Sequence, residues 1–255
     1  MLNKELIFKT LKDLNLKNTD TIMIHSSLHS IGKIENNAEG LIEALKEYFS
    51  NGLIIFPMHT WSFMNSDNQT LDLTIENSCV GMLPNIAFRH GFIRSKHPTH
   101  SVVAYGKKAF EYIKYDDTAN TPASPSGCFG RLGKMNAKIL FLGCPLSKNT
   151  FIHSIEEQFN VADRLTDHIY KFYTKDNNGI YEYNVHKHYS KYNAHLSEHY
   201  LKLEKPMIEK GIASYFMFGN AKSIIVDAKK CEEYVKELLI NNIHEFDNAL
   251  EVKKC

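Results

Sequence analysis

The sequence predicts an α/β fold, in the form of a layered α/β/α domain with a central mixed sheet and a small polar excursion around residues 167–210. Three observations lead to this prediction. Residues 53–56 and 139–143 are apolar throughout, which is typical of strands that are covered on both faces. Strand-like and helix-like patterns alternate near the N-terminus. The chain then becomes polar and rich in Tyr and His between residues 167 and 210.

The N-terminal elements form a βαβ pattern. Apolar residues recur at helical spacing within residues 7–14, and a β-rich run at residues 21–24 ends at His25. A second amphipathic helix is predicted over residues 41–49, before the apolar strand at 53–56. Since 255 residues are enough to enclose one large core, we expect residues 1–255 to form a single domain.

The later elements continue the same architecture. Apolar runs predict strands at 102–105, 139–143, 212–218 and 223–226, with helices from about Asn149, over 228–240 and in the tail at 241–255. The excursion at 167–210 is predicted to contain a hairpin and a helix. Two long loops, 58–80 and 114–133, are expected to be functional, because loops of that length are rarely idle in a compact domain. A binding site is expected at the strand ends.

Composition excludes several classes of partner. The chain has 30 Lys and Arg against 29 Asp and Glu, a net charge of +1, so it lacks the basic excess that nucleic-acid binding requires. No apolar run reaches the length of about 18 residues that spans a bilayer. The five cysteines are scattered and never spaced as Cys-x-x-Cys, which favours reduced thiols. We therefore expect a cytoplasmic protein without nucleic-acid or membrane partners; a homo-oligomer stays open.

The most informative stretch is residues 149–157, directly after the predicted strand at 139–143. Helical spacings of three and four residues bring Thr150, His153 and one of Glu156 or Glu157 together. A carboxylate beside an imidazole fixes its tautomer and stabilises the imidazolium formed by proton abstraction, which is the chemistry of a general base. The same spacing also fits a capped helix start with a solvated His and Glu.

Two hydroxyl-rich segments are candidate anion sites. Arg94 and Ser95 begin a segment of cations and hydroxyls ahead of a strand, which suits an anion but equally a surface turn. Ser26 and Ser27 follow the first predicted strand, where backbone amides and hydroxyls often bind phosphate. A hydrogen-bonded turn is the alternative there.

Two other chemistries are open. His195, Glu198 and His199 match the His-x-x-Glu-His zinc pattern, although the surrounding residues are polar rather than a buried helix face. Cys144 or Cys128 would make a thiol nucleophile with His153 as its partner, or else a small buried residue. The sequence contains no phosphate-binding Gly-x-x-x-x-Gly-Lys loop, no Gly-x-Gly-x-x-Gly and no Gly-x-Ser-x-Gly.

Taken in order, these pieces resemble the aminoglycoside 3-N-acetyltransferase family, the antibiotic N-acetyltransferases. The resemblance covers nearly the whole chain. It rests on Ile24-His25-Ser26-Ser27-Leu28 with Gly32, Pro57-Met58-His59-Thr60, Gly81-Met82-Leu83-Pro84, Phe88-Arg89, Arg94-Ser95-x-His97-Pro98-x-x-Ser101, Gly106, Ser124-Pro125, the strand 139–143, Asn149-Thr150-x-x-His153-x-x-Glu156, Gly219-Asn220-Ala221 and Asp227-Ala228.

The resemblance implies a single acetyltransferase domain that moves acetyl from acetyl-CoA, as cosubstrate and without a metal, to the 3-amino group of an aminoglycoside. It implies direct attack by the amine, with His153 as general base, Glu156 as its carboxylate partner and Thr150 as a nearby hydroxyl. The segments that border the coenzyme by resemblance contain Ser26, Ser27, Arg94, Ser95 and Ser124.

The acceptor is less well defined. Polycationic aminoglycosides need carboxylates as countercharges, and the candidates are Asp67, Asp72, Glu76, Glu157, Asp163 and Asp167. The excursion, however, carries many Lys and His residues. An N-acetyltransferase of a nucleotide-linked amino sugar in surface polysaccharide synthesis is therefore the main alternative; a zinc hydrolase and a catalytically silent binding protein are the others.

Overall fold

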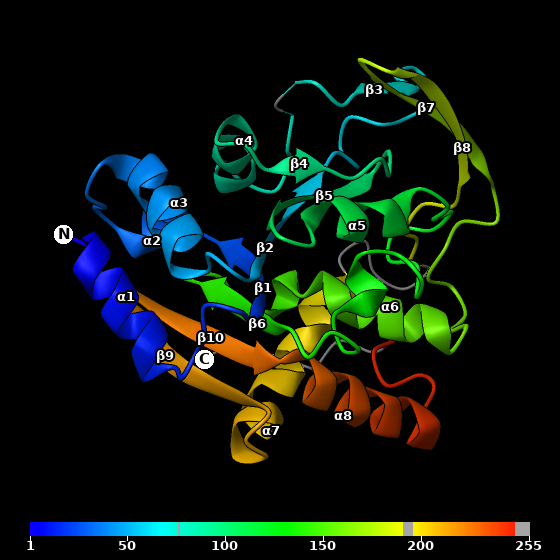
Figure 1. Ribbon diagram of the computed structural model, residues 1–255. Coiled ribbons are helices and arrows are strands. Elements are labelled where there is room, and N and C mark those ends of the chain that lie inside the picture. The colour runs from blue at the N-terminus through cyan, green and yellow to red at the C-terminus, as the bar shows by residue number, and fades with distance from the viewer. Residues whose placement is uncertain (76, 191–195, 248–255) are drawn as a thin grey trace.

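The computed structural model describes residues 1–75, 77–190 and 196–247 (Figure 1). It confirms the predicted α/β fold with a central mixed sheet. The sheet has seven strands, in the order β4 (Ile93–Arg94), β5 (His100–Gly106), β2 (Leu53–His59), β1 (Thr21–Ser26), β6 (Lys138–Leu142), β10 (Ala221–Asp227) and β9 (Ala213–Phe218).

The three central strands are parallel and the outer ones are antiparallel. β1 pairs in parallel with β2, as Ile22 opposite Ile54, and with β6, as Ile24 opposite Leu140. β5, β4, β10 and β9 each join by antiparallel pairing. Because parallel strands run in the same direction, the ends of β1, β2 and β6 meet at one edge of the sheet, which is where an α/β sheet places its ligands.

Helices cover both faces of the sheet (Figure 1). The helices are α1 (Lys4–Asp13), α2 (Leu28–Ile31), α3 (Asn37–Tyr48), α4 (Leu83–Arg89), α5 (Ala109–Ile113), α6 (Thr150–Gln158), α7 (Glu204–Glu209) and α8 (Ala228–Asn241), with 3₁₀ helices η1 (Lys114–Asp116), η2 (Phe129–Arg131), η3 (Leu146–Lys148) and η4 (Leu196–Leu203). Ile22 and Ile24 pack in the core under α1, α3 and α4, whereas Met23 packs in the core under α5, α6 and α8. The inner strands are therefore covered on both faces, and β2 is buried at every residue.

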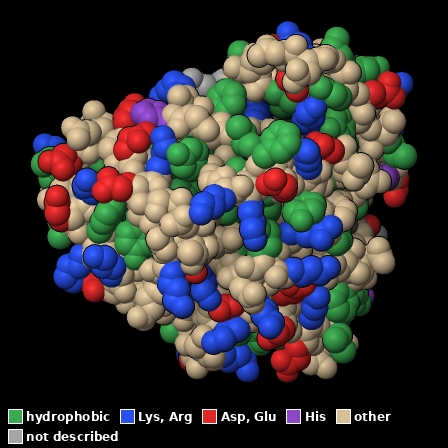
Figure 2. Space-filling model, viewed as in Figure 1, with side chains coloured by type: hydrophobic (Ala, Val, Ile, Leu, Met, Phe, Trp, Pro, Cys, Tyr) green, Lys and Arg blue, Asp and Glu red, His purple; other side chains and the backbone are tan. Residues whose placement is uncertain are grey.

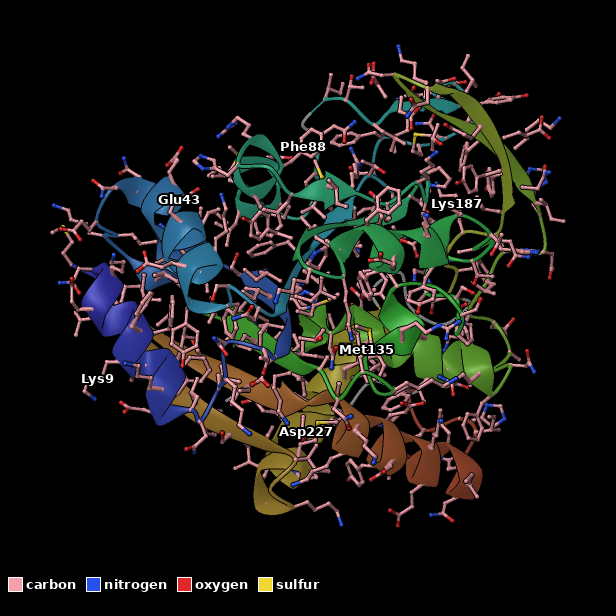
Figure 3. All side chains as sticks on the ribbon, in the orientation of Figure 1. Lys9, Glu43, Phe88, Met135, Lys187 and Asp227 are labelled. Carbon is pink, nitrogen blue, oxygen red and sulfur yellow. The ribbon has the colours of Figure 1, made fainter. Side chains whose placement is uncertain are left out.

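Local sequence fixes where the long helices begin. Asn3 accepts a hydrogen bond from the Leu6 amide at the start of α1, and Asp227 accepts one from the Lys230 amide at the start of α8, at the position labelled in Figure 3. Such caps satisfy amides that have no partner within the helix. Both helices then bury an apolar stripe, which in α1 consists of Ile7 and Leu11.

The polar excursion contains the predicted hairpin, and the structure adds a strand to it. β7 (Tyr170–Asp176) and β8 (Gly179–Val185) are antiparallel, and β3 (Thr70–Asp72) pairs in parallel with β7. β3 comes from the long loop at 58–80, for which no strand was predicted. This three-stranded sheet lies beyond the β4 and β5 side of the main sheet (Figure 1) and has its own small core, which includes Met64, Phe172 and Val185.

The helical tail predicted for 241–255 is wrong as far as residue 247. α8 ends at Asn241, and residues 242–247 form turns that bury Phe246; residues 248–255 lie outside the described part. In the described residues, no helix is both long enough and apolar enough to cross a bilayer. On the face shown in Figure 2, Lys and Arg are interspersed with Asp and Glu, as the net charge of +1 predicts.

Candidate active site

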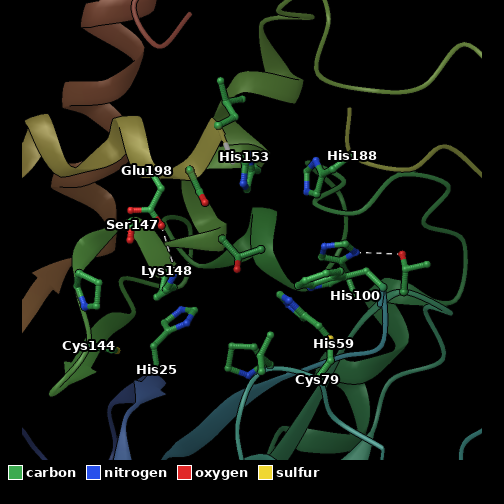
Figure 4. A pocket seen from close by; sticks show the side chains of 18 of the residues that line it. His25, His59, Cys79, His100, Cys144, Ser147, Lys148, His153, His188 and Glu198 are labelled. Carbon is green, nitrogen blue, oxygen red and sulfur yellow. Dashed lines mark hydrogen bonds and ion pairs between the residues drawn. The ribbon is translucent and has the colours of Figure 1, made fainter. Parts of the chain in front are cut away.

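A cavity of about 910 Å³ opens at the edge of the sheet where the parallel strands end (Figure 4). Its walls come from the ends of β1 and β2, the segment between β6 and α6, the first turn of α6, the segment after β8 and the start of η4. Five of the lining residues are histidines: His25, His59, His100, His153 and His188. Segments that are far apart in the sequence thus share one site.

His153 stands on the first turn of α6 and faces this cavity with a side chain that is 15% exposed. Its Nδ1 lies 2.7 Å from the hydroxyl oxygen of Tyr200 and 3.4 Å from Oε2 of Glu156. The Tyr200 hydroxyl also donates a hydrogen bond to Oε2 of Glu156. Tyr200 is fully buried in η4, so the hydroxyl bridges the imidazole and the carboxylate without water.

This bridge fixes the tautomer of His153. Glu156 is ionised, so it only accepts hydrogen bonds, and the single Tyr200 proton is directed to it. The Tyr200 oxygen must therefore accept a proton from the imidazole, which places hydrogen on Nδ1 of His153. The other ring nitrogen, Nε2, is left with a lone pair for the cavity.

Glu156 is held by a second charge. Its Oε1 accepts a hydrogen bond from Nε of Arg164 at 2.5 Å, and Arg164 also binds Oδ1 of Asp247 at 2.5 Å. Burial raises the pKa of Glu156, but the hydrogen bond and charge of His153 and the charge of Arg164 outweigh burial, so the pKa lies below its ordinary value. The carboxylate stays charged although it is 0% exposed.

Helical spacing alone did not decide whether Glu156 or Glu157 is the carboxylate beside His153. Glu157 points away from His153, toward the long loop 114–133. Its carboxylate accepts hydrogen bonds from the Thr121 hydroxyl and, at 3.1 Å, from the Ala123 amide in the long loop 114–133. Burial raises its pKa to about 7, despite those two bonds. The geometry therefore pairs His153 with Glu156, and Glu157 anchors the loop.

Thr150, Ser26 and Ser27 line the cavity, as the sequence predicts. Thr150 is the first residue of α6, so its hydroxyl lies beside helix amides that have no partner within the helix. Ser27 caps α2 through the Ser30 amide at 3.4 Å, and its hydroxyl lies 2.9 Å from that of Ser30. Ser26 ends β1 at the same edge of the sheet.

Arg94 and Ser95, which the resemblance places near the coenzyme, are not among the described residues that line the cavity. The Arg94 guanidinium is buried and donates to the Ser101 and Asn77 side chains and to the carbonyls of Ile75 and Met58. Burial lowers the pKa of Arg94 to about 9. These bonds use its donors inside the protein, so Arg94 stabilises the turn rather than offering a cation to a ligand.

Ser95 and Ser124 are engaged in similar internal contacts. The Ser95 hydroxyl donates to Oδ2 of the buried Asp116 at 2.5 Å, and it accepts from the Val102 amide. The hydroxyls of Ser124 and Ser126 lie 3.1 Å apart, and Ser124 is not among the described residues that line the cavity. Of the five residues predicted at the coenzyme, the structure brings only Ser26 and Ser27 to the cavity.

The cysteines are poor candidates for a nucleophile. Burial raises the pKa of Cys144 to about 12, and it raises the pKa of Cys128 further above its ordinary value. The Cys128 thiol also donates to the Tyr112 carbonyl, at 3.3 Å. Because the thiolate is the reactive form, protonated thiols of this kind are unreactive at neutral pH.

The zinc pattern is not assembled in the described residues. His195 lies outside them, Oε1 of Glu198 pairs with Lys148 at 3.3 Å, and Nδ1 of the buried His199 lies 2.5 Å from the Phe246 carbonyl oxygen. Across residues 1–75, 77–190 and 196–247, no three His, Cys, Asp or Glu side chains are arranged to hold a metal ion. The segment forms a 3₁₀ helix, η4, whose buried residues support the cavity.

Sequence reasoning missed Tyr200, His59, His100 and His188. His188 lies in the polar excursion and was given no role from the sequence, yet its ring lies 4.2 Å from that of His153, centroid to centroid. The register of β2 and β5 places His59 opposite His100, with ring centroids 4.5 Å apart. A signal was present for His59, because it ends a strand that leads to the site edge; none was present for Tyr200.

A family model described as aminoglycoside 3-N-acetyltransferase matches residues 23–240. Among curated proteins, aminoglycoside N(3)-acetyltransferase IV from Salmonella sp is 29% identical over 143 residues, which are 53% of this chain and 51% of that protein. Aminoglycoside N(3)-acetyltransferase VII from Streptomyces paromomycinus is 26% identical over 167 residues, 58% of each chain. The chain thus spans between half and three fifths of the length of these two relatives.

Solved structures share the fold over nearly the whole chain. The AAC-IIIb binary complex with CoASH has a TM-score of 0.80 and 18% identity, covering 94% of this chain and 96% of that one. The AAC(3)-IVa apoenzyme has a TM-score of 0.77 and 20% identity, covering 96% and 91%. The YokD protein from Bacillus subtilis has a TM-score of 0.77 and 19% identity, covering 95% and 94%.

Proposed function

Because the chain belongs to the aminoglycoside 3-N-acetyltransferase family, we propose that it is an N-acetyltransferase in which His153 is the general base. The cosubstrate is acetyl-CoA, whose thioester supplies the acetyl group. The observation that carries this proposal is the bridge from Nδ1 of His153 through the Tyr200 hydroxyl to Glu156, which leaves Nε2 to accept a proton.

The site residues account for each proton in the transfer. Nε2 of His153 removes a proton from the acceptor amine, the amine nitrogen forms a bond to the thioester carbonyl carbon, and the carbon–sulfur bond breaks. The thiolate of coenzyme A leaves and takes the proton from the imidazolium. The charge that His153 carries in between is balanced by Glu156, at 3.4 Å and through Tyr200.

The first turn of α6 suits the oxyanion that forms in this step. Thr150 lines the cavity one turn before His153, and the amides at the start of α6 have no partner within the helix. A donor aimed at such an oxyanion is worth about 3–4 kcal/mol of barrier in measured cases. We assign this role to Thr150 or to a neighbouring amide.

The coenzyme side of the cavity is assigned to Ser26, Ser27 and Lys148. All three line the cavity, and the serines follow a parallel strand, where a phosphate or pantetheine group meets backbone amides. One complex of a protein with this fold is titled as a binary with CoASH. Both relatives are named aminoglycoside N(3)-acetyltransferases, so the 3-amino group of an aminoglycoside is the first acceptor to consider.

The test is His153→Ala, assayed by release of coenzyme A thiol from acetyl-CoA. We expect turnover to fall about 100- to 10,000-fold, the range that a general base contributes, while calorimetry shows unchanged binding of acetyl-CoA. His168→Ala is the matched control, because His168 is exposed and outside the cavity. Near-normal turnover of His153→Ala would remove His153 from the role of base.

A further inference from the structure

Three imidazoles in the cavity wall have a nitrogen with no hydrogen-bond partner in the described structure. Nε2 of His25, His59 and His188 is buried and unpaired, and all three residues line the cavity. Figure 4 shows these side chains around the same hollow as His153. His59 is only 5% exposed and His25 only 8%. Buried polar atoms are nearly always paired, so these three nitrogens require a partner from outside the described residues, which is either a ligand or ordered water.

These imidazoles are neutral. Burial lowers the pKa of His25 to about 3 and holds the pKa values of His59 and His188 well below the ordinary value, with neighbouring histidines lowering the latter two further. A neutral Nε2 makes one hydrogen bond, as donor or acceptor according to its tautomer. A hydroxyl group both donates and accepts hydrogen bonds, so it can pair with a neutral Nε2 in either tautomer.

His59 and His188 belong to a row of rings that begins at His153. The His188 ring centroid is 4.2 Å from that of His153, His100 is 4.9 Å from His188, and His59 is 4.5 Å from His100. The four rings form a continuous row that starts at the base. His25 lies in a different part of the cavity wall. It belongs to the end of β1, next to Ser26, and its ring stacks on that of Phe141 in β6.

The carboxylates of the described residues do not take part in this wall, and Glu76 lies outside those residues. Among the described residues that line the cavity, Glu198 is the one carboxylate, and it is paired with Lys148. Asp72 binds Lys175 at 3.0 Å, Glu157 binds the loop at Thr121, and neither lines the cavity. Lys187 also lines it, next to His188.

We propose that His59 and His188 bind the acceptor through hydrogen bonds to its hydroxyl groups, and that this acceptor is an amino sugar with a single amino group rather than a polycation. The inference rests on the proposed transferase function and narrows its acceptor. A polycation entering this wall would meet Lys187 and neutral rings, so its additional ammonium groups would lose water without gaining countercharges. A single amine next to hydroxyls meets His153 and the two free nitrogens.

The acceptor class is tested by thiol release from acetyl-CoA with three acceptors: sisomicin, a free 4-amino-4,6-dideoxyhexose and the same sugar linked to a nucleoside diphosphate. We expect kcat/KM for one of the two sugars to exceed that for sisomicin at least tenfold, and the two sugar arms identify whether the free or the linked form is the source. A higher kcat/KM for sisomicin overturns the proposal while leaving the transferase function intact. Thiol release with none of the three overturns it as well; in that case, failure to bind acetyl-CoA in calorimetry would show that the transferase function has failed too.

The roles of the two histidines are tested with His59→Asn and His188→Asn, using the better sugar. We expect the KM for the sugar to rise at least tenfold in each variant and the KM for acetyl-CoA to change less than twofold. His168→Asn, at an exposed position outside the cavity, should change neither. An unchanged sugar KM in both variants would mean that ordered water alone satisfies these nitrogens, and an increase only in the acetyl-CoA KM would place them at the coenzyme; either result overturns the proposal.

A measurement on the unaltered protein covers the case in which a variant does not fold. Nitrogen resonances of the imidazole rings are followed while the sugar is titrated into the protein. The Nε2 signals of His59 and His188 should shift with a common saturation curve, while that of His168 should not. If neither signal shifts at saturating sugar, the proposal that His59 and His188 bind the acceptor is contradicted.

Discussion

Tyr200 and His153 are 47 residues apart in the chain, yet their contact determines which nitrogen of the imidazole faces the cavity. A carboxylate bonded directly to the imidazole would achieve the same, but here the direct separation is 3.4 Å and the hydroxyl oxygen is closer, at 2.7 Å. Since Tyr200 is 0% exposed, its hydroxyl has no water with which to exchange partners.

Tyr200→Phe tests this bridge. The variant keeps the ring and its packing but removes the group that accepts from Nδ1, so the two tautomers of His153 are no longer distinguished. We expect kcat to fall about 10- to 100-fold, a part of what a general base contributes, with the KM for acetyl-CoA unchanged. The pH profile of kcat should also shift, which a loss of packing alone would not produce. Tyr189→Phe, at an exposed cavity position, is the control.

At the scale of elements, α6 is tied to the C-terminal turn after α8. Arg164 bridges Glu156 on α6 and Asp247 in that turn, and the Phe246 ring packs against Tyr200 with centroids 5.2 Å apart. These contacts involve groups that are almost completely buried, so each charge depends on the others for stabilisation.

Arg164→Met tests this dependence. Removal of Arg164 takes the guanidinium away from the buried Glu156 and leaves Asp247 with His244 alone, at 2.7 Å. We expect a loss of about 3–5 kcal/mol in the free energy of unfolding, measured by urea denaturation. Arg89→Met is the matched control, because Arg89 and Glu39 are 4.0 Å apart and largely exposed; such a surface pair contributes about 1 kcal/mol or less. Equal losses in the two variants would contradict the account.

The turn between β6 and the cavity requires glycine. Gly143 has φ of +69°, and a Cβ there would lie 2.7 Å from Cβ of Ser30 and 2.9 Å from Cβ of Ala221. Gly211 has a similar φ of +64° but open space around it. The two positions therefore separate the effect of backbone strain from that of steric contact.

We expect Gly143→Ala to destabilise the protein by about 1–3 kcal/mol more than Gly211→Ala, because overpacking adds to the strain that both share. Thermal unfolding of the two variants gives the comparison. Since Gly143 lines the cavity, thiol release should also fall in the first variant only. Identical unfolding temperatures would show that the neighbours of Gly143 move aside at little cost.

Sequence patterns predicted the elements better than their long-range contacts. Helical spacing predicted that His153 lies near one of Glu156 or Glu157, because those residues share one helix, and the structure places Glu156 beside it. β3 was missed because three residues in a polar loop carry no periodicity, and its partner β7 lies about a hundred residues later. Composition alone could not separate an anion site from a hydrogen-bonded turn at Arg94, and the structure shows the contacts of such a turn. The catalytic assignments of His153, Glu156 and Thr150 stay predictions.

At the scale of the whole molecule, one buried acid links stability to pH. Burial raises the pKa of Glu157 from its ordinary value of 4.5 to about 7, so the folded state binds a proton that the unfolded state has already lost. Unfolding therefore releases that proton, so stability falls as pH rises between those two values. Above pH 7 the fold contains a charged carboxylate inside the loop 114–133.

Glu157→Gln should remove this dependence. The amide retains an oxygen for the Ala123 amide and carries no charge, so the variant should match the natural protein near pH 4 and exceed its stability by about 1–3 kcal/mol at pH 8. Urea denaturation across this range is the measurement. A constant difference at all pH values would show that the carboxyl group does not titrate as proposed.

The contact between Arg164 and Asp247 also sets an order of events during synthesis. A ribosome delivers the chain from its N-terminus, so the sheet strands, the imidazoles and Glu156 all emerge before residues 246 and 247. Asp247 is therefore the last of these three charged residues to be added, and until then Arg164 and Glu156 lack the second carboxylate. A chain cut just before residue 246 would contain every strand of the sheet but would lack part of the support of Glu156 and Tyr200.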